Sequence, residues 1–286
     1  MPKKKKCRLL LCGGLGNQLF QYAFARCLSL RSQALLELDS VTMFEQDTKY
    51  DRTYELDAFK LPSEVTVRRS RRLFYRCELF MEKMVFRYLA FDQRPFMRES
   101  QSLQFFPDYN NWQLKRSVSL LGHWPSEHYF KDFKAQIKQD LMFRTGVCPK
   151  QASLAAEICS RTSAAVHVRR LQYENKLDIN YYSLAMRQMR EKVPGVHFYV
   201  FSDDPTWCRE NGFDTIDVTL VDGQHLPAIE DFKLMTLCRH FIIANSTFSW
   251  WAAWLSEGSG SLIYRPPDHI WDALSPALIV DRWLSP

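Results

Sequence analysis

The sequence of 286 residues predicts an α/β fold with two facing Rossmann-like domains. In the first 40 residues, an apolar run leads through glycines into a segment of helical period, and a second apolar run follows. From 164 to 264, short apolar runs again alternate with helical segments, which is typical of a parallel sheet covered on both faces. Because roughly 100–200 residues make a domain, the chain is long enough for one such unit at each end.

The first half of the chain begins with a β–turn–α–β unit. Strands are expected at 8–11 and 34–38. A helix is expected from Asn17, a suitable N-cap, because apolar residues then recur at helical spacing. The segment 68–91 mixes arginine and lysine with aromatic residues, which predicts one or more amphipathic helices.

The second half alternates more regularly. Its predicted strands are 164–168, 197–202, 215–218, 241–244 and 262–264, and its predicted helices are 180–191, 228–238 and 248–255. Gly146 and Pro149 interrupt the pattern ahead of this series. We therefore expect an N-terminal domain over 1–148 and a C-terminal domain over 149–286.

The chain carries a formal net charge of +6, from 38 Lys and Arg against 32 Asp and Glu. Lys3–Lys6 supply four of the positive charges, which leaves 34 against 32 in the rest of the chain. So small a balance does not indicate a nucleic-acid-binding protein, and we expect no nucleic acid partner. Peripheral attachment to anionic lipid through Lys3–Lys6 and the cluster Arg68–Arg76 stays open.

The lack of a recognisable targeting signal and the cysteine usage lead us to expect a cytoplasmic chain. If the basic segments bind lipid, the chain would be peripheral at the inner face of the membrane. A membrane-spanning helix needs about 20 apolar residues, and the stretches Leu9–Leu15 and Trp250–Leu255 are far shorter. The glycines after Lys3–Lys6 also interrupt the apolar part of a secretory signal. The eight cysteines are scattered without a C-x-x-C pair, so we expect reduced thiols.

A glycine-rich turn follows the first predicted strand. It comprises Gly13, Gly14, Gly16, Asn17 and Gln18. Backbone N–H groups at such a strand-to-helix turn favour an anion or a closely approaching ligand. The dinucleotide fingerprint fails because Leu19 takes its last glycine position, although Asp39 lies where an acid would hold a ribose. A ligand-facing turn, a merely tight turn and a dinucleotide site stay open, in that order.

Arg169 and Arg170 follow a predicted strand. His167 and Arg169 are two residues apart on it and so lie on one face. At the carboxyl end of a parallel strand, that face opens onto the crevice where ligands bind. An arginine fork suits the two oxygens of a phosphate and would stabilise charge on a diphosphate leaving group. A structural ion pair of one or both arginines is the alternative.

Two further polar turns follow strands of the same half. Asp203 and Asp204 stand where a carboxylate accepts hydrogen bonds from a guanine edge or caps the next helix. The other turn carries Asn245, Ser246, Thr247 and Ser249. Hydroxyls and backbone N–H groups there converge on a phosphate or cap the helix. Capping explains each turn alone, but three turns at the ends of three strands favour a nucleotide-diphosphate site.

Four segments carry a resemblance to a known family. They are Gly13–Tyr22, Gly122–Phe130, His167–Arg170 and Ala244–Trp254, and the last is long and specific. In their order and spacing, which cover nearly the whole chain, they resemble the GDP-fucose-dependent α-1,2-fucosyltransferases of bacteria and animals.

The resemblance implies a GT-B-type glycosyltransferase with the active site in the cleft between two Rossmann-like domains. It implies inverting transfer of L-fucose from GDP-β-L-fucose to the 2-hydroxyl of a terminal β-galactose, which forms an α-1,2 linkage in an oligosaccharide such as an O-antigen. The implied partners are this donor and a galactoside acceptor. No cofactor or metal is implied, and the sequence contains no D-x-D triplet.

The resemblance also implies roles for residues of the second half. The predicted donor-binding residues are His167, Arg169, Arg170, Asp203, Asp204, Asn245, Ser246, Thr247 and Ser249. Arg169 would hold the diphosphate, while His167 and one of the two aspartates would address the guanine. Ser246 and Thr247 would face the phosphates or the sugar.

One departure affects the catalytic base. The family commonly continues its arginine pair with Gly-Asp-Tyr, whereas this chain has Leu171, Gln172 and Tyr173. Gln172 cannot take a proton as a carboxylate would. The predicted catalytic residues are Arg169, which stabilises the leaving diphosphate, and the nearby acids Glu174 and Asp178. Asp39 in the opposite half and the departing diphosphate itself are alternative proton acceptors.

The acceptor is expected to bind against the first half of the chain. The predicted acceptor or cleft residues are Gly14, Gly16, Asn17, Gln18, Asp39, Trp124 and Glu127. The face of Trp124 suits the CH surface of a sugar but would serve equally well in a core. The alternative functions are a nucleotide-sugar transferase of other linkage or acceptor, and a basic protein that binds polynucleotides or membrane surfaces.

Overall fold

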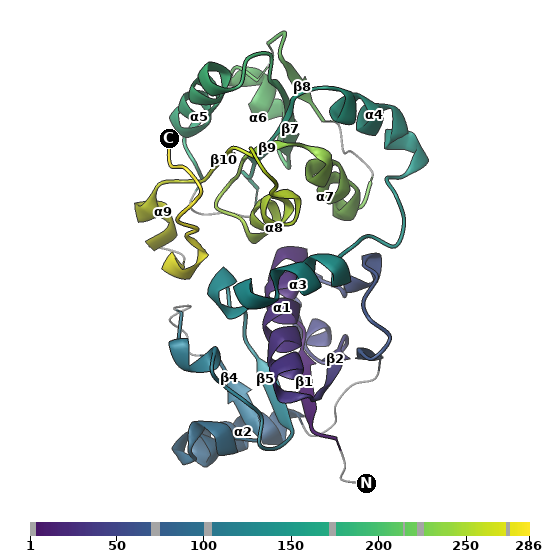
Figure 1. Ribbon diagram of the computed structural model, residues 1–286, viewed down its shortest axis with the longest axis vertical. Coiled ribbons are helices and arrows are strands. Elements are labelled where there is room, and N and C mark those ends of the chain that lie inside the picture. Colours follow the sequence, from purple (N-terminus) through teal and green to yellow (C-terminus); the bar gives the residue numbers. More distant parts are fainter. Residues whose placement is uncertain are drawn as a thin grey trace. The chain divides into compact units, whose positions relative to one another are not determined.

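The computed structural model describes residues 4–69, 75–99, 105–171, 176–213, 215–221, 226–272 and 275–286. The chain forms two compact units, Met1–Arg144 with Ser275–Leu278 and Thr145–Leu274 with Ile279–Pro286 (Figure 1). Each unit contains a five-stranded sheet of parallel strands, which confirms the predicted α/β class. The division falls slightly before the boundary expected after residue 148, and no sequence pattern indicated that 275–278 would group with the first unit.

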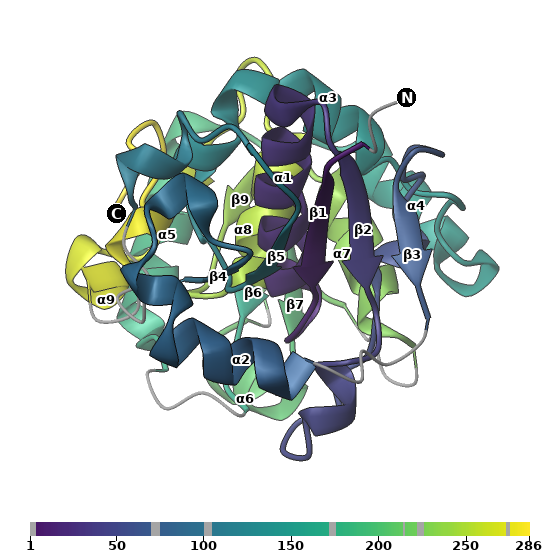
Figure 2. The same cartoon turned by 90° about the horizontal axis from the view of Figure 1, so that it is seen from below.

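The sheet of the first unit has the strand order β3-β2-β1-β5-β4. Its strands are β1 (Lys6–Leu10), β2 (Leu35–Asp39), β3 (Thr66–Arg68), β4 (Phe96–Arg98) and β5 (Val118–Leu121). Cys7 of β1 lies opposite Leu36 of β2 and Val118 of β5. Figure 2 looks onto this sheet, with β1, β2 and β3 side by side. The predicted strands at 8–11 and 34–38 are confirmed, with small shifts at their ends.

Helices cover both faces of this sheet. They are α1 (Leu15–Ser32), α2 (Tyr75–Met84) and α3 (Lys134–Asp140), with 3-10 turns at Phe44–Gln46, Leu56–Ala58, Phe86–Tyr88, Phe91–Gln93, Pro107–Tyr109, Glu127–Tyr129 and Lys131–Phe133. The Cys7 thiol contacts the carbonyl of Ala25 in α1, whereas Leu10 packs with Tyr75 of α2. Because side chains alternate along a strand, Cys7 and Leu10 point to opposite faces, and so α1 and α2 cover opposite faces.

The glycine turn sets the start of α1. Gly13 has a φ of +74°, which only glycine adopts without strain. Gly14 is the N-cap, and it offers no side-chain hydrogen bond. The helix therefore begins at Leu15, and the expectation that Asn17 caps it is wrong.

A buried ion pair joins α1 to α3. Arg26 Nε donates to Asp140 Oδ2 at 2.9 Å, and the side chains are only 6% and 1% exposed. The same carboxylate oxygen accepts from Tyr22 Oη at 2.8 Å, while Arg26 also reaches Glu64 at 2.8 Å. The carboxylate thus compensates a cation and a hydroxyl that the fold has removed from water.

The sheet of the second unit has the strand order β10-β9-β6-β7-β8. Its strands are β6 (Ser163–Val168), β7 (His197–Ser202), β8 (Val218–Leu220), β9 (His240–Ile242) and β10 (Ile263–Tyr264). Its helices are α4 (Ala152–Ser160), α5 (Ile179–Lys192), α6 (Pro205–Glu210), α7 (Ala228–Leu237), α8 (Thr247–Ser256) and α9 (Asp268–Asp272), with 3-10 turns at Pro149–Gln151 and Pro276–Leu278.

These elements confirm the predicted alternation except at one strand. The strand expected at 215–218 begins only at Val218. Asp217 instead accepts hydrogen bonds from Arg190 at 2.6 Å and from Thr215 at 2.8 Å, and Ile216 is fully exposed. The apolar pattern at 215–218 therefore belongs to a turn that enters β8.

The strand order reverses beside β6. The chain proceeds from β6 to β7 and β8 in one direction, then crosses over to β9 and β10 in the other. Because such crossovers are right-handed, α5 and α6 lie on one face and α7 and α8 on the other. Ligands of doubly wound sheets bind at the carboxyl ends of the strands where the order reverses. In this unit that place lies beyond the ends of β6 and β9.

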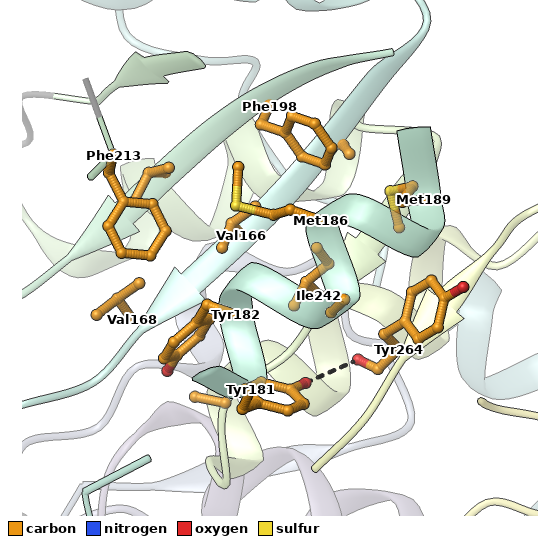
Figure 3. Packing of buried hydrophobic residues seen from close by; sticks show 14 of the residues in the cluster. Val166, Val168, Tyr181, Tyr182, Met186, Met189, Phe198, Phe213, Ile242 and Tyr264 are labelled. Atoms are coloured by element: carbon orange, nitrogen blue, oxygen red, sulfur yellow. Dashed lines mark hydrogen bonds between the residues drawn. The ribbon is translucent and has the colours of Figure 1, made fainter. Parts of the chain in front are cut away.

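The core on the α5 side fixes the start of this helix against the strand ends (Figure 3). Side chains of the sheet and of α5 interdigitate there, among them Val166, Val168, Phe198, Ile242, Tyr182, Met186 and Met189. Tyr181 Oη donates to the carbonyls of Ile243 at 2.7 Å and Tyr264 at 3.3 Å. On the other face, Trp250, Trp251 and Trp254 of α8 are fully buried, so the aromatic residues of this helix are core residues.

None of the helices within the described ranges is both long and apolar enough to cross a membrane. All eight cysteines have free thiols, as expected, and Cys7, Cys27, Cys208 and Cys238 are buried.

Candidate functional site

The three polar turns predicted in the second half meet at one edge of its sheet. Val168, the last residue of β6, lies opposite Ser202 of β7, and Val166 lies opposite Ile242 of β9. Since the three strands are parallel neighbours, the residues that follow them emerge together. We call this place the donor edge, and it consists of residues 167–171, 202–204 and 243–249.

Arg169 is held at the donor edge by Asp203. Its guanidinium lies 3.1 Å from Asp203 Oδ2, and its side chain is 25% exposed. Asp203 Oδ1 also accepts from the backbone N–H of Arg170 at 2.7 Å, and Oδ2 accepts from that of Leu171 at 3.1 Å. One carboxylate therefore fixes both the turn after β6 and the side chain that it presents. Asp203 acts as a positioning residue for Arg169, and its predicted contact with guanine stays a prediction.

Replacing Asp203 by asparagine should lower kcat/KM for the sugar donor by roughly 10–100-fold, because hydrogen bonds to a charged carboxylate contribute about 1.5–3 kcal/mol. The neutral amide loses the ion pair with Arg169 and one of the acceptor oxygens. Steady-state kinetics with varied donor measures the effect. Asp204→Asn, which alters only a helix cap, should retain most of the activity; an equal loss in both variants would contradict a specific role for Asp203.

Arg170, Asp204 and Asp178 are occupied by structural contacts. The Arg170 guanidinium lies over the Trp207 ring at 4.0 Å and donates to the carbonyl of Leu177 at 3.2 Å. The predicted contact of Arg170 with the donor stays a prediction. Asp204 caps α6 by accepting from the N–H of Trp207 at 3.0 Å, and exposed Asp178 caps α5 through the N–H of Asn180 at 2.8 Å.

His167 is a buried, neutral imidazole at the first position of the donor edge. Its side chain is 6% exposed, and Nδ1 lies 2.9 Å from Ser249 Oγ. Burial, assisted by the nearby Arg169 charge, lowers the pKa of His167 to about 3. A neutral ring offers one donor and one acceptor, which suits a polar ligand group better than a proton transfer near neutral pH.

The low pKa of His167 predicts a pH-dependent stability. The unfolded chain binds this proton near pH 6.5, whereas the folded chain does not until about pH 3, so its contribution is complete above 6.5 and is lost as pH falls. Between about pH 6 and 4, the free energy of unfolding should fall by up to about 1.4 kcal/mol per pH unit more in the wild type than in His167→Gln. Urea unfolding at several pH values measures the difference; His269→Gln, at an exposed position, should follow the wild type.

The turn from β9 into α8 presents hydroxyls and a helix N-terminus to the donor edge. Ser246 is the N-cap and accepts from the N–H of Phe248 at 3.3 Å. Ser249 Oγ accepts from the N–H of Ala244 at 3.2 Å, which ties the helix to the end of β9. Asn245 is buried and Thr247 is half-buried. Together with Arg169, this helix terminus provides the positive field that a diphosphate requires.

In the first unit, the glycine turn occupies the equivalent place after β1, but Gln18 does not face a ligand. It is fully buried; its amide nitrogen donates to the carbonyls of Gly13 and Thr53, both at 2.8 Å, and its oxygen accepts from the N–H of Glu55 at 3.0 Å. Gln18 thus fixes the turn against residues 53–55, which corrects its assignment as an acceptor residue. Gly16 is buried, and Asn17 packs under Gly13.

Arg52 lies beside this turn, and no sequence motif marked it. A Cβ on Gly14 would stand 3.7 Å from the Arg52 guanidinium. The absence of a side chain at Gly14 therefore leaves room for this cation next to the N-terminus of α1. The half-buried Gly14 and Asn17 stay candidates for the acceptor side.

Trp124 and Asp39 have structural roles that correct their assignment as acceptor or cleft residues. Trp124 is fully buried and stacks on Phe24 with ring centroids 4.4 Å apart, so it presents no face to a sugar. Asp39 is 3% exposed; it accepts from the N–H and the hydroxyl of Thr42 at 2.8 and 2.7 Å. Glu127 is half-buried in a 3-10 turn and stays a candidate.

Glu99 and His123 are two largely buried titratable residues of the first unit, and no sequence motif marked Glu99. Glu99, which follows β4, accepts from the backbone N–H groups of His123 at 2.5 Å and Trp124 at 2.9 Å. Burial raises the pKa of Glu99 and lowers that of His123. Gln21 pairs with the backbone of Cys12 through both amide atoms, so its nitrogen must face His123 Nδ1, at 3.1 Å. The neutral His123 therefore carries its proton on Nε2.

Two predicted positions lie outside the described residues, namely Gln172 and the candidate base Glu174. Among the residues that the structure does describe, no group of three or more His, Cys, Asp or Glu side chains is placed to hold a metal ion.

Two parallel sheets, one of which presents an arginine, hydroxyls and a helix N-terminus beyond its switch point, fit the class of nucleotide-sugar-dependent glycosyltransferases. The comparisons agree. The chain belongs to glycosyl transferase family 11, whose family model matches residues 7–269.

Known relatives are similar along much of the chain. An α-1,2-colitosyltransferase of Escherichia coli is 28% identical over 260 residues, which cover 86% of each chain. Human galactoside α-(1,2)-fucosyltransferase 1 is 32% identical over 158 residues, which cover 51% of this chain and 39% of the human protein. The chain is therefore an enzyme, a glycosyltransferase of family 11.

A solved structure supports the fold. The α-1,6-fucosyltransferase NodZ of Bradyrhizobium, in a crystal soaked with GDP-fucose, matches with a TM-score of 0.55 and 16% identity. The match covers 88% of this chain and 93% of the NodZ chain. It confirms the two-domain GT-B architecture predicted from the sequence.

Proposed function

We propose that this protein transfers L-fucose from GDP-β-L-fucose to the 2-hydroxyl of a terminal β-galactose, with inversion to an α-1,2 linkage. The names of its relatives include both this sugar and this linkage, and the fold is shared with a fucosyltransferase whose crystal was soaked with GDP-fucose. The single observation that carries the proposal is Arg169, fixed by Asp203 at the strand-end edge where the N-terminus of α8 also begins.

The chemistry follows from where charge develops. As the bond from the fucosyl carbon to the diphosphate breaks, positive charge grows on the sugar ring and negative charge on the leaving GDP. A partly buried guanidinium and the helix N–H groups are in place before the reaction and stabilise the leaving group more than the intact donor. This difference is what accelerates transfer. Ser246 and Thr247 would contact the phosphates or the fucose.

The proton of the attacking hydroxyl needs an acceptor. Asp39 and Asp178 each accept a backbone N–H hydrogen bond, Asp39 at the end of β2 and Asp178 at the start of α5. Glu174 remains a candidate from the sequence. The alternative acceptor is the departing diphosphate, which gains negative charge; because inversion brings the hydroxyl in from the opposite face of the sugar, the proton would have to reach it through water. No metal ion is needed in this scheme, in keeping with the absence of a D-x-D triplet.

One observation favours a second candidate for the sugar donor, namely GDP-colitose. The relative that matches 86% of this chain is named for colitose, whereas the human relative named for fucose matches 51%. Transfer of colitose from its GDP derivative would use the same diphosphate contacts, since these do not involve the sugar. The two candidates therefore share the donor edge and differ in the transferred sugar.

The test incubates the purified chain with GDP-fucose or GDP-colitose and a panel of β-galactosides, with EDTA in a parallel series. Mass spectrometry identifies the transferred sugar, and NMR or methylation analysis locates the linkage. We expect fucose on O2 in an α linkage, with or without EDTA. Exclusive transfer of colitose would replace the donor assignment, and no product on any galactoside would contradict the acceptor class.

A further inference from the structure

An exposed apolar patch lies on α2 and the turn that follows it. Of the eleven large hydrophobic side chains that are exposed among the described residues, five fall between Phe80 and Tyr88. Phe80 is 61% exposed, Met84 58% and Tyr88 73%. Single exposed apolar residues are ordinary, but a cluster of this kind marks an interaction site.

The patch is one of two apolar stripes along α2. The other stripe already packs against the sheet. Tyr75, Leu79 and Phe86 pack with Leu10, Phe96 and Leu121 of the sheet. The exposed residues Cys77, Phe80, Met81, Met84 and Tyr88 recur at intervals of three and four, so they share the opposite side. Packing of α2 on the sheet is complete without this second stripe, so folding of the unit does not explain it.

The charges beside the stripe have one sign. Arg76, Lys83 and Arg87 are exposed, whereas the acids Glu78 and Glu82 are half-buried on the side toward the sheet. Arg68 and Arg69, which precede the helix, are exposed as well. The outer side of this segment therefore combines aromatic and thioether side chains with cations alone. This is the pattern of a helix that lies in the interface of an anionic membrane.

We propose that the outer side of α2 and its 3-10 turn, residues 76–88, binds the surface of an anionic lipid bilayer. Phe80, Met84 and Tyr88 enter the headgroup region, and the flanking cations contact lipid phosphates. A symmetric contact with a second copy of the chain is disfavoured, because it would bring Arg76, Lys83 and Arg87 of the two copies together. The enzyme would thus be held at a membrane surface through one unit.

A second cationic surface provides the matched control. A groove of about 370 Å³ is lined by Lys4, Lys5, Lys6, Arg8, Arg116 and Ser117. Within it Lys6 and Arg8 pair with Glu37, and Lys5 donates to the carbonyl of Leu114. None of its lining residues is a large apolar one, so it can attract lipid only through charge.

The experiment is cosedimentation of the full chain with vesicles of phosphatidylcholine, with and without phosphatidylglycerol. We expect binding only with phosphatidylglycerol and weakening at high salt. Phe80→Ser/Met84→Ser and Lys83→Gln/Arg87→Gln should each lower the partition coefficient by roughly tenfold or more. Lys4→Gln/Arg116→Gln removes the same charge from the groove, and Ile216→Ser removes an exposed apolar side chain elsewhere; both should bind nearly as the wild type does. Melting temperatures verify that the exposed substitutions leave the fold intact.

Several results would overturn the proposal. These are absence of binding to any vesicle, binding of the α2 variants as strong as that of the wild type, and an equal loss in the groove variant. The oligomeric state, measured by sedimentation equilibrium, provides a further result that would overturn it. A dimer that is lost in Phe80→Ser/Met84→Ser, without vesicle binding by the wild type, would make the face a contact between copies.

Discussion

Replacing Arg169 by alanine is expected to lower kcat for sugar transfer by about 10²–10³-fold, the loss seen when one preorganised group that stabilises developing negative charge is removed. Arg169 is 25% exposed and held 3.1 Å from Asp203, so it reaches a ligand without having to reorganise. Because its contribution grows as the diphosphate departs, saturation with donor should not restore the rate. Initial rates at saturating donor and acceptor measure the effect.

Two variants sharpen this prediction. Arg169→Lys keeps the charge but not the fork, and should recover only part of the rate, since a lysine cannot contact two phosphate oxygens as a guanidinium does. Arg187→Ala, at an exposed position of α5, changes the net charge equally and should leave the rate unchanged. A normal rate in Arg169→Ala at saturating donor would refute stabilisation of the leaving group by this residue.

Replacing Asp140 by alanine is expected to lower the free energy of unfolding by about 3–5 kcal/mol, because it strands a buried cation. The Arg26 guanidinium would keep only Glu64, which is 56% exposed, and the Tyr22 hydroxyl would lose its acceptor. The network joins α1 to α3, so the loss should affect the whole first unit. Urea unfolding followed by circular dichroism provides the measurement.

Two further variants distinguish the destabilisation caused by an uncompensated charge from that caused by a lost packing contact. Asp132→Ala, at an exposed position close to α3, should change stability by less than about 0.5 kcal/mol. Arg26→Met/Asp140→Leu removes both charges and should be clearly more stable than Asp140→Ala alone. If the double variant is no better than the single one, the loss comes from packing and the assignment of an uncompensated charge is wrong.

The sequence alone predicted those helices and strands whose apolar pattern is local. The apolar runs that became β6 and β7 needed no tertiary information, because buried parallel strands are apolar on both faces. The donor edge was predictable for a related reason: parallel neighbours bring their carboxyl ends together, so Arg169, Asp203 and Ser246 had to meet. Two of these three turns, at His167–Arg170 and Ala244–Trp254, also lie in the segments that carry the family resemblance.

What the sequence did not reveal are the contacts of side chains whose partners are distant in the chain. Asp203 is engaged by the turn 33 residues before it, and Glu99 by His123, 24 residues after it, through strand pairing that no local pattern encodes. Trp124 fits a sugar platform and a core equally well by type, and only the stack on Phe24 decides for the core. The partner of a polar or aromatic residue, rather than its type, determines its role.

The central claim is that the donor edge binds the diphosphate of a GDP-sugar, and a crystal structure of the chain with GDP tests it most directly. We expect the diphosphate within hydrogen-bond distance of the Arg169 guanidinium and of the residues that start α8, Ser246 and Thr247. A diphosphate bound away from the ends of β6 and β9, out of contact with Arg169, would contradict the assignment of the site.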